Sequence, residues 1–211
     1  MIKIYILNTE HLDEHMIDSL PFGESEKHRL TAMGSSKHKM ESLGGLVALK
    51  RLFKKAGAPY TEICRNSRGK PYFSGDAPLP FGISHSNGIA AAALGDAECA
   101  DIGFDLEIVR DGIDTDAIAK RYFSEKELGQ LAKSDTPSDL FFSIWTAKEA
   151  YAKLDGRGLA AVISENNEQT YENAYLYRLT ADIGGQRAVL SVVCRSEGQA
   201  VQIFTDTEEN K

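Results

Sequence analysis

The segment at residues 102–109, IGFDLEIV, most narrowly limits what this chain can fold into. Hydrophobic residues alternate there with small or acidic ones, and this period of two predicts a β-strand over 102–108 with one hydrophobic face. Asp105 and Glu107 then lie together on the opposite face. They form either an ordinary wetted strand face or part of a site for a cation.

Composition limits the class of protein. The chain has 211 residues, of which 42% are hydrophobic, enough for one large domain or two small ones. It has no run of about 18 apolar residues that would span a membrane, and its start, MIKIYIL, resembles a strand more than a signal peptide. Because Cys64, Cys99 and Cys194 have no metal or disulfide spacing, we expect reduced thiols and a cytoplasmic location.

The charge is unevenly distributed along the chain. The formal net charge is −7, yet residues 1–75 contain twelve Lys or Arg and eight Asp or Glu, whereas the remainder contains twelve and twenty-three. An acidic chain is a poor candidate for non-specific nucleic-acid binding. The asymmetry is compatible with a basic half for an anionic ligand and an acidic half for a cation.

The chain divides near its middle. A Gly- and Pro-rich loop at 73–82 and a break at 94–101 suggest a boundary that separates residues 1–97 from 98–211. The triplet SEK occurs at 25–27 and again at 124–126, and helical apolar positions repeat with the same offset. These repeats predict an α+β fold built from two similar α/β halves.

The periodicity also predicts the individual elements. We expect helices over 35–56, 113–121, 124–133 and 138–154. We expect strands over 2–7, 89–94, 102–108, 174–181, 187–195 and 199–205, of which the last two form a hairpin around SEGQ.

The segment FFSIWTAKEAYAKLDGRGL, residues 141–159, places Glu149 and Lys153 one helical turn apart. They form either an exposed ion pair worth about 0.2–0.5 kcal/mol or part of a site, which the nearby Trp145 favours because it suggests that this face is partly covered. If Glu149 joins Asp105 and Glu107, three carboxylates converge, and such a cluster must bind a cation or take up a proton. Mg²⁺ fits because it prefers hard oxygen ligands and shares its shell with phosphates.

Two further segments are suited to phosphate. Ser84, His85 and Ser86 precede the turn pair Asn87–Gly88, so their hydroxyl, imidazole and backbone groups could hold phosphate oxygens, although a plain hairpin turn explains them equally. The segment RNSRGKPYF at 65–73 combines a glycine, a lysine and a proline, and taken alone it is only a basic turn. A Ser/His/Asp hydrolase is disfavoured because no G-x-S-x-G motif occurs.

Taken in order, the segments SEKHR, GKPYF, ISHS, GFDLE, RYFSEKE and WTAKEAYAKLDGRGL resemble the 4′-phosphopantetheinyl transferases of the surfactin-synthetase-activating (Sfp-like) type. The resemblance implies two halves related by a pseudo-twofold axis with the active site between them: 1–97 on the coenzyme A nucleotide side and 98–211 with the metal and the catalytic acids. It also implies Mg²⁺-dependent transfer of 4′-phosphopantetheine from coenzyme A to a serine of an acyl or peptidyl carrier protein, a holo-[acyl-carrier-protein] synthase activity that yields 3′,5′-ADP.

The resemblance also implies roles for particular residues. The implied magnesium ligands are Asp105, Glu107 and Glu149; the implied catalytic residues are Glu149, as the base, and Lys153. The implied coenzyme A contacts are Lys27, Gly69, Lys70, Pro71, Ser84, His85, Ser86 and Lys153. The chain departs from the family where an arginine for the 3′-phosphate is common, because Met40 stands near that place with Lys37 and Lys39 close by, and Glu127 matches a recurrent acidic position without an assigned role.

Two other functions remain compatible with these residues. An acidic triad also suits a metal-dependent phosphohydrolase or nuclease, and a non-catalytic paralogue could bind coenzyme A or a carrier protein without turnover. For the transferase we expect a monomer that binds neither nucleic acid nor a membrane.

Overall fold

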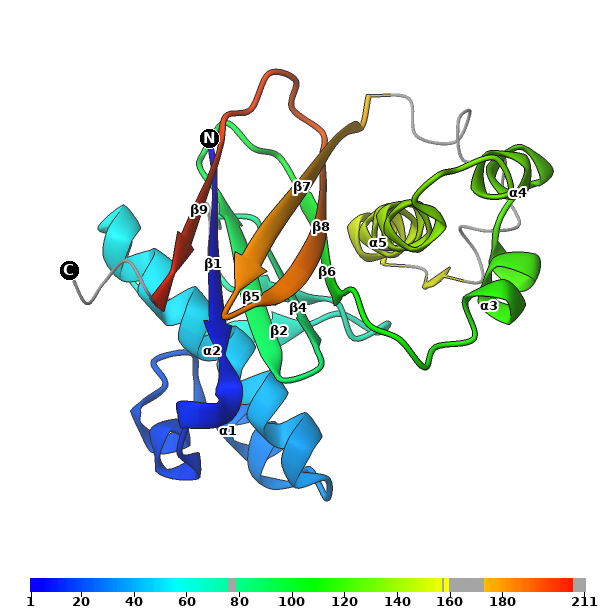
Figure 1. Ribbon diagram of the computed structural model, residues 1–211. Helices are drawn as coiled ribbons and strands as arrows, with labels where there is room; N and C mark the ends of the chain where they lie inside the picture. Colours follow the sequence, from blue (N-terminus) through cyan, green and yellow to red (C-terminus); the bar gives the residue numbers. More distant parts are fainter. Residues whose placement is uncertain (76–78, 157, 160–172, 207–211) are drawn as a thin grey trace.

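The structure is a computed structural model that describes residues 1–75, 79–156, 158–159 and 173–206 (Figure 1). Its centre consists of two neighbouring β-sheets. The four-stranded sheet has the order β4-β5-β1-β9, formed by β4 (Phe81–Ser86), β5 (Ile89–Gly95), β1 (Ile2–Asn8) and β9 (Val201–Thr205). The three-stranded sheet has the order β6-β8-β7, formed by β6 (Ile102–Ile108), β8 (Gln186–Cys194) and β7 (Tyr175–Ile183). A small hairpin is formed by β2 (Ile63–Arg65) and β3 (Pro71–Phe73).

Helices cover the outer faces of the two sheets. The helices are α1 (Glu24–Thr31), α2 (Ser36–Ala56), α3 (Thr115–Tyr122), α4 (Glu125–Leu131) and α5 (Pro137–Asp155), with 3₁₀ turns η1 (Thr9–His11) and η2 (Glu14–Ser19). In Figure 1, α2 crosses the four-stranded sheet, whereas α5 lies beside the three-stranded sheet with α3 and α4 outside it. None of the helices in the described ranges combines the length and hydrophobicity needed to cross a membrane.

The hydrophobic pattern explains this layering. On β1, Ile2, Ile4 and Ile6 face a core shared with β5, β6 and β8, whereas Tyr5 and Leu7 face the core under α2. A strand that is apolar on both faces must be covered on both sides. The layers therefore run from α2 through the two sheets to α5, which packs on β8 and β6.

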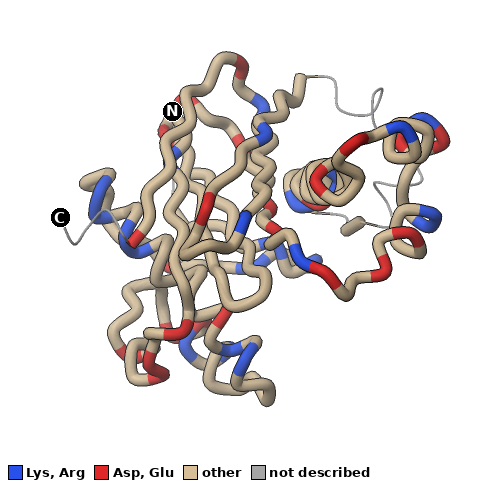
Figure 2. The backbone as a smooth tube through the Cα atoms, in the orientation of Figure 1, with Lys and Arg blue, Asp and Glu red and all other residues tan. Residues whose placement is uncertain are grey.

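Helix α2 forms where the apolar periodicity predicts it. Ser35 caps its start by accepting a hydrogen bond from the His38 backbone N–H, and Gly57 ends it in the left-handed conformation with φ = 64°. Basic residues lie at both ends of this helix (Figure 2).

The expected α+β class is confirmed, and every helix and strand expected from periodicity is present within a few residues of its predicted bounds. The expected ranges did not include α1, β4 or the short strands β2 and β3. The division at residues 97 and 98 stays a prediction; β9, although late in the chain, lies in the sheet that contains β1.

The expected hairpin around SEGQ is wrong. Strand β8 pairs with β6 and with β7, and β7 and β8 are joined through Gly184 and Gly185, which both have positive φ. Strand β9 instead pairs in parallel with β1, with Ile2 opposite Val201. Strand β8 is largely buried and occupies the centre of its sheet. Because β6 and β7 already pair with both of its edges, β8 has no edge left for β9.

Candidate active site

The carboxylates of β6 face the neighbouring strand β4. Asp105 and Glu107 lie on the face opposite the core residue Phe104, as the alternation predicts. The Ser84 hydroxyl donates to Asp105 Oδ1 at 2.8 Å, and the Ser86 hydroxyl donates to Glu107 Oε2 at 2.5 Å. Because Asp105 is only 4% exposed, the alternative of an ordinary wetted face is wrong for this residue.

A glycine brings α5 close to the same face of β6. A Cβ atom on Gly103 would overlap the Ala150 carbonyl oxygen and would lie 2.6 Å from the Leu154 nitrogen. The absence of a side chain therefore lets the last turns of α5 lie directly on the strand. In this arrangement Lys153 Nζ lies 2.6 Å from Asp105 Oδ1.

The ammonium group of Lys153 joins α5 to both strands. Besides the ion pair with Asp105, it donates a hydrogen bond to the Ser84 hydroxyl at 3.0 Å. The alternative of a simple exposed pair between Glu149 and Lys153 is therefore wrong, because the lysine is directed to a buried carboxylate on another element.

The electrostatics show that the carboxylates act on one another. Burial, followed by the negative charges of Asp105 and Glu107, raises the pKa of Glu149 to about 7, although Lys153 opposes the shift. Burial also raises the pKa of Glu107, against the hydrogen bond from Ser86. A buried carboxyl group with such a pKa is a candidate functional group when it also lines a cavity.

One carboxylate oxygen of the site is chemically suited to a divalent cation. Asp105 Oδ2 is buried and has no hydrogen-bond partner, and carboxylate oxygens are the hard ligands that Mg²⁺ prefers. Within the described ranges, however, no three His, Cys, Asp or Glu side chains are gathered closely enough to hold a metal ion. In this structure the Lys153 ammonium forms an ion pair with Asp105 through the other oxygen, Oδ1.

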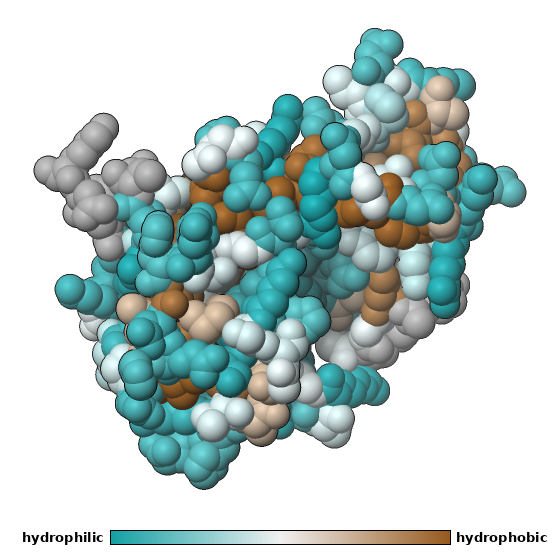
Figure 3. All heavy atoms as spheres, turned by 60° about the horizontal axis from the view of Figure 1, so that its bottom comes forward, coloured by the Kyte–Doolittle hydropathy of each residue, from teal (hydrophilic) through white to brown (hydrophobic). Residues whose placement is uncertain are grey.

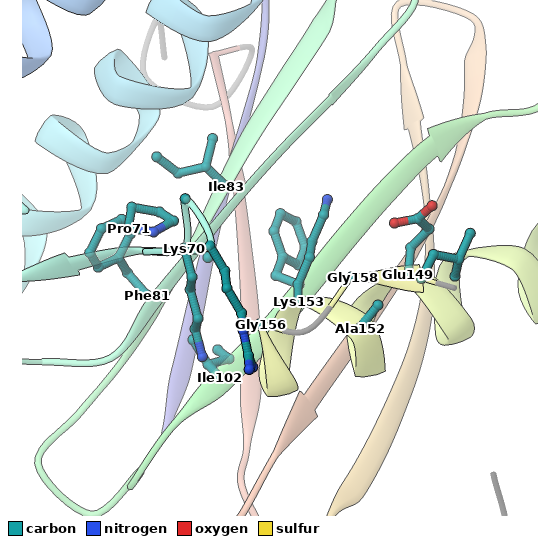
Figure 4. Close-up of a pocket in the computed structure, with 15 residues that line it drawn as sticks. Lys70, Pro71, Phe81, Ile83, Ile102, Glu149, Ala152, Lys153, Gly156 and Gly158 are labelled. Carbon is teal, nitrogen blue, oxygen red and sulfur yellow. The ribbon is translucent and has the colours of Figure 1, made fainter. Parts of the chain in front are cut away.

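A cavity of about 280 Å³ opens beside these groups (Figure 4). Glu149 and Lys153 extend into it from the same side of α5, and the hairpin residues Lys70 and Pro71 form part of the facing wall. Gly69 also lines the cavity. Its remaining lining is mostly apolar and comes from Phe81, Ile83, Ile102, Phe104, Ala152 and Leu159, with Gly82, Gly156, Gly158 and Arg68. The cavity thus offers charged groups for an anion and an apolar surface for the rest of a ligand. Seen from below (Figure 3), the molecular surface is mostly hydrophilic, with patches of hydrophobic atoms.

The hairpin wall is held in place by polar contacts. Lys70 Nζ donates to the Asp101 carboxylate at 2.9 Å and to the Leu154 carbonyl oxygen at 2.8 Å. Arg65 donates to the Gly69 carbonyl oxygen, which fixes a glycine that has φ = 84°. The Lys70 ammonium therefore ties the hairpin to the end of α5 and to the residue before β6.

The structure does not bring every predicted contact to this cavity. Lys27 pairs with Glu24 on its own helix at 2.8 Å, and Lys39 pairs with Glu14 at 3.2 Å. Neither lysine is among the residues that line the cavity. His85 and Ser86 also lie outside that lining, although Ser86 contacts Glu107 next to it.

Glu127 and Trp145, which the sequence analysis named, make contacts that hold α5 against its neighbouring helices. Glu127 completes the capping box of α4 and lies 2.9 Å from Lys148 Nζ, which is almost fully buried. Trp145 stacks against Phe141 and tilts against Tyr122, on the side of α5 that faces α3.

Sequence reasoning missed three residues near the site. Arg110 donates to the Ser86 hydroxyl at 2.8 Å and lies 3.7 Å from Glu107, and its place three residues after Glu107 was a usable signal. Arg68 lines the cavity, and its place beside the basic turn was another signal. Glu41 lies 3.3 Å from His85, and its position within an apolar helix face gave no hint of a partner on β4.

Residues 101–183 match the sequence profile of the family described as the 4′-phosphopantetheinyl transferase superfamily. This segment contains the two carboxylates of β6 and all of α5, so the match covers the acidic part of the site. The likeness to 4′-phosphopantetheinyl transferases expected from the motifs is confirmed at this level.

Individual relatives carry the same name. Over 99 residues, 44% of this chain, it is 38% identical to the 4′-phosphopantetheinyl transferase HetI of Nostoc sp.. Over 124 residues, 58% of this chain, it is 34% identical to the 4′-phosphopantetheinyl transferase AcpT of Salmonella typhimurium, and it is 36% identical over 94 residues, 44% of this chain, to a 4′-phosphopantetheinyl transferase of Bacillus subtilis. The aligned part spans 41%, 62% and 40% of the lengths of these three relatives.

Proposed function

We propose that this chain is a 4′-phosphopantetheinyl transferase of the surfactin-synthetase-activating type, which moves the phosphopantetheine group of coenzyme A to a serine of an acyl or peptidyl carrier protein. The observation that carries the proposal is the cavity in which Glu149 and Lys153 face the Gly69–Pro71 hairpin, next to the buried Asp105. The similarity to transferases of this name supports the same reaction.

In the proposed reaction the carrier serine oxygen forms a bond to the phosphorus that bears pantetheine. The bond from that phosphorus to the bridging oxygen breaks, and 3′,5′-ADP leaves with the bridging oxygen. Glu149 accepts the proton of the serine hydroxyl, because its carboxylate extends into the cavity beside Lys153. Lys153 stabilises the negative charge that develops on the leaving phosphate, because its ammonium group is already held at the end of the cavity.

Mg²⁺ is the proposed cofactor, with Asp105, Glu107 and Glu149 as its protein ligands. When bound, it would offset the negative charge of the pyrophosphate. The unpaired Oδ2 atom of Asp105 supports this role. Ser84 and Ser86 orient the carboxylates of β6 through their hydroxyl groups, so each serine contributes by positioning as well as by any contact with phosphate.

Intact-mass spectrometry of an apo-carrier protein tests the proposal. We expect the carrier to gain the mass of one phosphopantetheine when it is incubated with this chain, coenzyme A and Mg²⁺, and to stay unmodified when a chelator replaces Mg²⁺. An unmodified carrier under all conditions, for carriers of both fatty-acid and peptide synthesis, would refute the transferase.

The same reaction mixture separates the transferase from the two other candidate functions. A phosphohydrolase would consume coenzyme A in the absence of the carrier protein. A non-catalytic paralogue would bind coenzyme A without consuming it. We expect consumption of coenzyme A only when the carrier is present.

A further inference from the structure

A buried carboxylate of α2 contacts the imidazole of β4. Glu41, whose side chain is 6% exposed, directs Oε2 to His85 Nδ1 at a distance of 3.3 Å. Its other oxygen, Oε1, accepts a hydrogen bond from the Gly88 backbone N–H at 3.0 Å. Thr9 binds the same turn from the other side, because its hydroxyl donates to the Gly88 carbonyl oxygen at 2.8 Å.

These contacts have a consequence for the imidazole ring. A carboxylate can only accept hydrogen bonds, and it would repel the lone pair of a bare ring nitrogen, so this contact favours a hydrogen on Nδ1. The ring of His85 thus presents Nδ1 to Glu41. Nε2 lies on the opposite edge of the ring, and the side chain is 36% exposed.

We propose that Glu41 is a positioning residue for coenzyme A binding, which holds His85 with Nδ1 toward α2 so that Nε2 meets a phosphate oxygen. The inference rests on the proposed function, because the role of His85 in phosphate binding belongs to that function. Once a phosphate is bound, the ring lies between two anions and donates to both, and charge-assisted hydrogen bonds of this kind are about twice as strong as neutral ones.

Most of the surroundings of His85 disfavour a charged ring, and Glu41 counteracts them. Burial lowers the pKa of His85, and the positive charges of Lys153 and His38 act in the same direction. Glu41, and to a smaller extent Asp105, favour the charged ring. Of the groups from α2, α5 and β6 that act on this ring, Glu41 has the largest effect in favour of the charge that a phosphate requires.

The test compares Glu41→Gln with Thr9→Val. The glutamine keeps an oxygen that can accept the Gly88 N–H, but it presents an amide that can donate to Nδ1. Thr9→Val removes a hydrogen bond from the same turn and leaves the contact with His85 intact. Calorimetry measures the Kd of coenzyme A for each variant, and ¹⁵N NMR of the histidine ring reports which nitrogen carries the hydrogen, with His85→Ala used to assign the signal.

We expect Glu41→Gln to raise the Kd of coenzyme A about tenfold, as substitutions of ligand-orienting residues do, and to move the ring hydrogen from Nδ1 to Nε2. Thr9→Val should change neither quantity. In the His85→Ala background, Glu41→Gln should have no further effect on Kd.

Three results would overturn the inference: an unchanged ring tautomer in Glu41→Gln, an equal rise in Kd in Thr9→Val, or an undiminished effect of Glu41→Gln in the His85→Ala background. Both readouts are independent of turnover. A wild-type chain that binds coenzyme A but modifies no carrier would therefore refute the transferase while the role of Glu41 is still decided.

Discussion

At the scale of single residues, Glu149 combines a stability cost with a chemical use. Its carboxyl group is partly buried near Asp105 and Glu107, and this environment raises its pKa to about 7. The alternation on β6 and the helical spacing on α5 are local patterns, and they predicted which side chains share a face of each element; that the three carboxylates form one site was implied only by the family resemblance. The buried state of Asp105 and the contact of Lys153 with Ser84 depend on how α5 lies on β6, which no local pattern specifies.

We expect Glu149→Gln to lower the rate of carrier modification by about 10²–10⁴-fold, because a glutamine cannot accept the serine proton. Intact-mass spectrometry of the carrier over time measures the rate, and circular dichroism checks the fold. Glu125→Gln, on the exposed start of α4, is the matched control and should keep the wild-type rate. A wild-type rate for Glu149→Gln would remove this residue from the role of base.

The same carboxyl group predicts how stability depends on pH. Its pKa is about 7 in the folded chain, above the 4.5 of an unperturbed glutamate, so the folded state binds more protons between these values and loses stability as the pH rises through them. Both proteins are measured in chelator. The free energy of unfolding of Glu149→Gln minus that of the wild type should rise by about 1–3 kcal/mol between about pH 5 and pH 8. Urea unfolding at the two pH values measures the gain, and a difference that does not vary with pH would contradict the assigned pKa.

At the scale of elements, the contact of α5 with β6 positions the site. It depends on Gly103, where any Cβ would meet the backbone of α5 at Ala150 and Leu154. Helix α5 carries both Glu149 and Lys153, so a displacement of this helix would move both groups relative to Asp105.

Gly103→Ala should therefore destabilise the fold by about 1–3 kcal/mol and reduce activity beyond that loss. Gly129→Ala is the control, because Gly129 lies in α4 with nothing near its Cβ position, and there alanine should stabilise the helix by about 0.5–1 kcal/mol. Chemical unfolding and the carrier assay measure both effects. Equal stability of the two variants would show that α5 can yield without cost.

The pairing of elements was less predictable than their type. The bounds of α2 and β6 follow from periodicity and caps, whereas the partner of β9 does not, since either β8 or β1 satisfies its short alternating pattern. The same holds for the Lys70 ammonium. The basic turn that contains Lys70 suggested phosphate binding. In the fold, however, Asp101 and the Leu154 carbonyl oxygen lie within reach of the Lys70 ammonium.

At the scale of the whole molecule, residues far apart in the chain complete one sheet. β9 is the parallel partner of β1, and Asp206, which follows it, contacts Arg51 of α2 and Tyr5 of β1. These contacts join residues on the two sides of the expected boundary at 97 and 98, which stays a prediction.

We expect a chain that ends after Ala200 to unfold at a temperature lower by about 5 °C or more, since it loses the strand pairing along β1 and the contacts of Asp206. A chain that ends after Asp206 keeps these contacts and is the control. Thermal unfolding followed by circular dichroism measures both. An unchanged midpoint in the shorter chain would show that β9 adds nothing to the sheet.

The pairing of β1 with β9 also bears on how the protein is made. During translation Ile2 leaves the ribosome long before its partner Val201. At about 5–20 residues per second, the first strand waits about 10–40 s for that neighbour. Throughout this interval one edge of the nascent sheet lacks its strand, so the four-stranded sheet can close only after β9 has been synthesised.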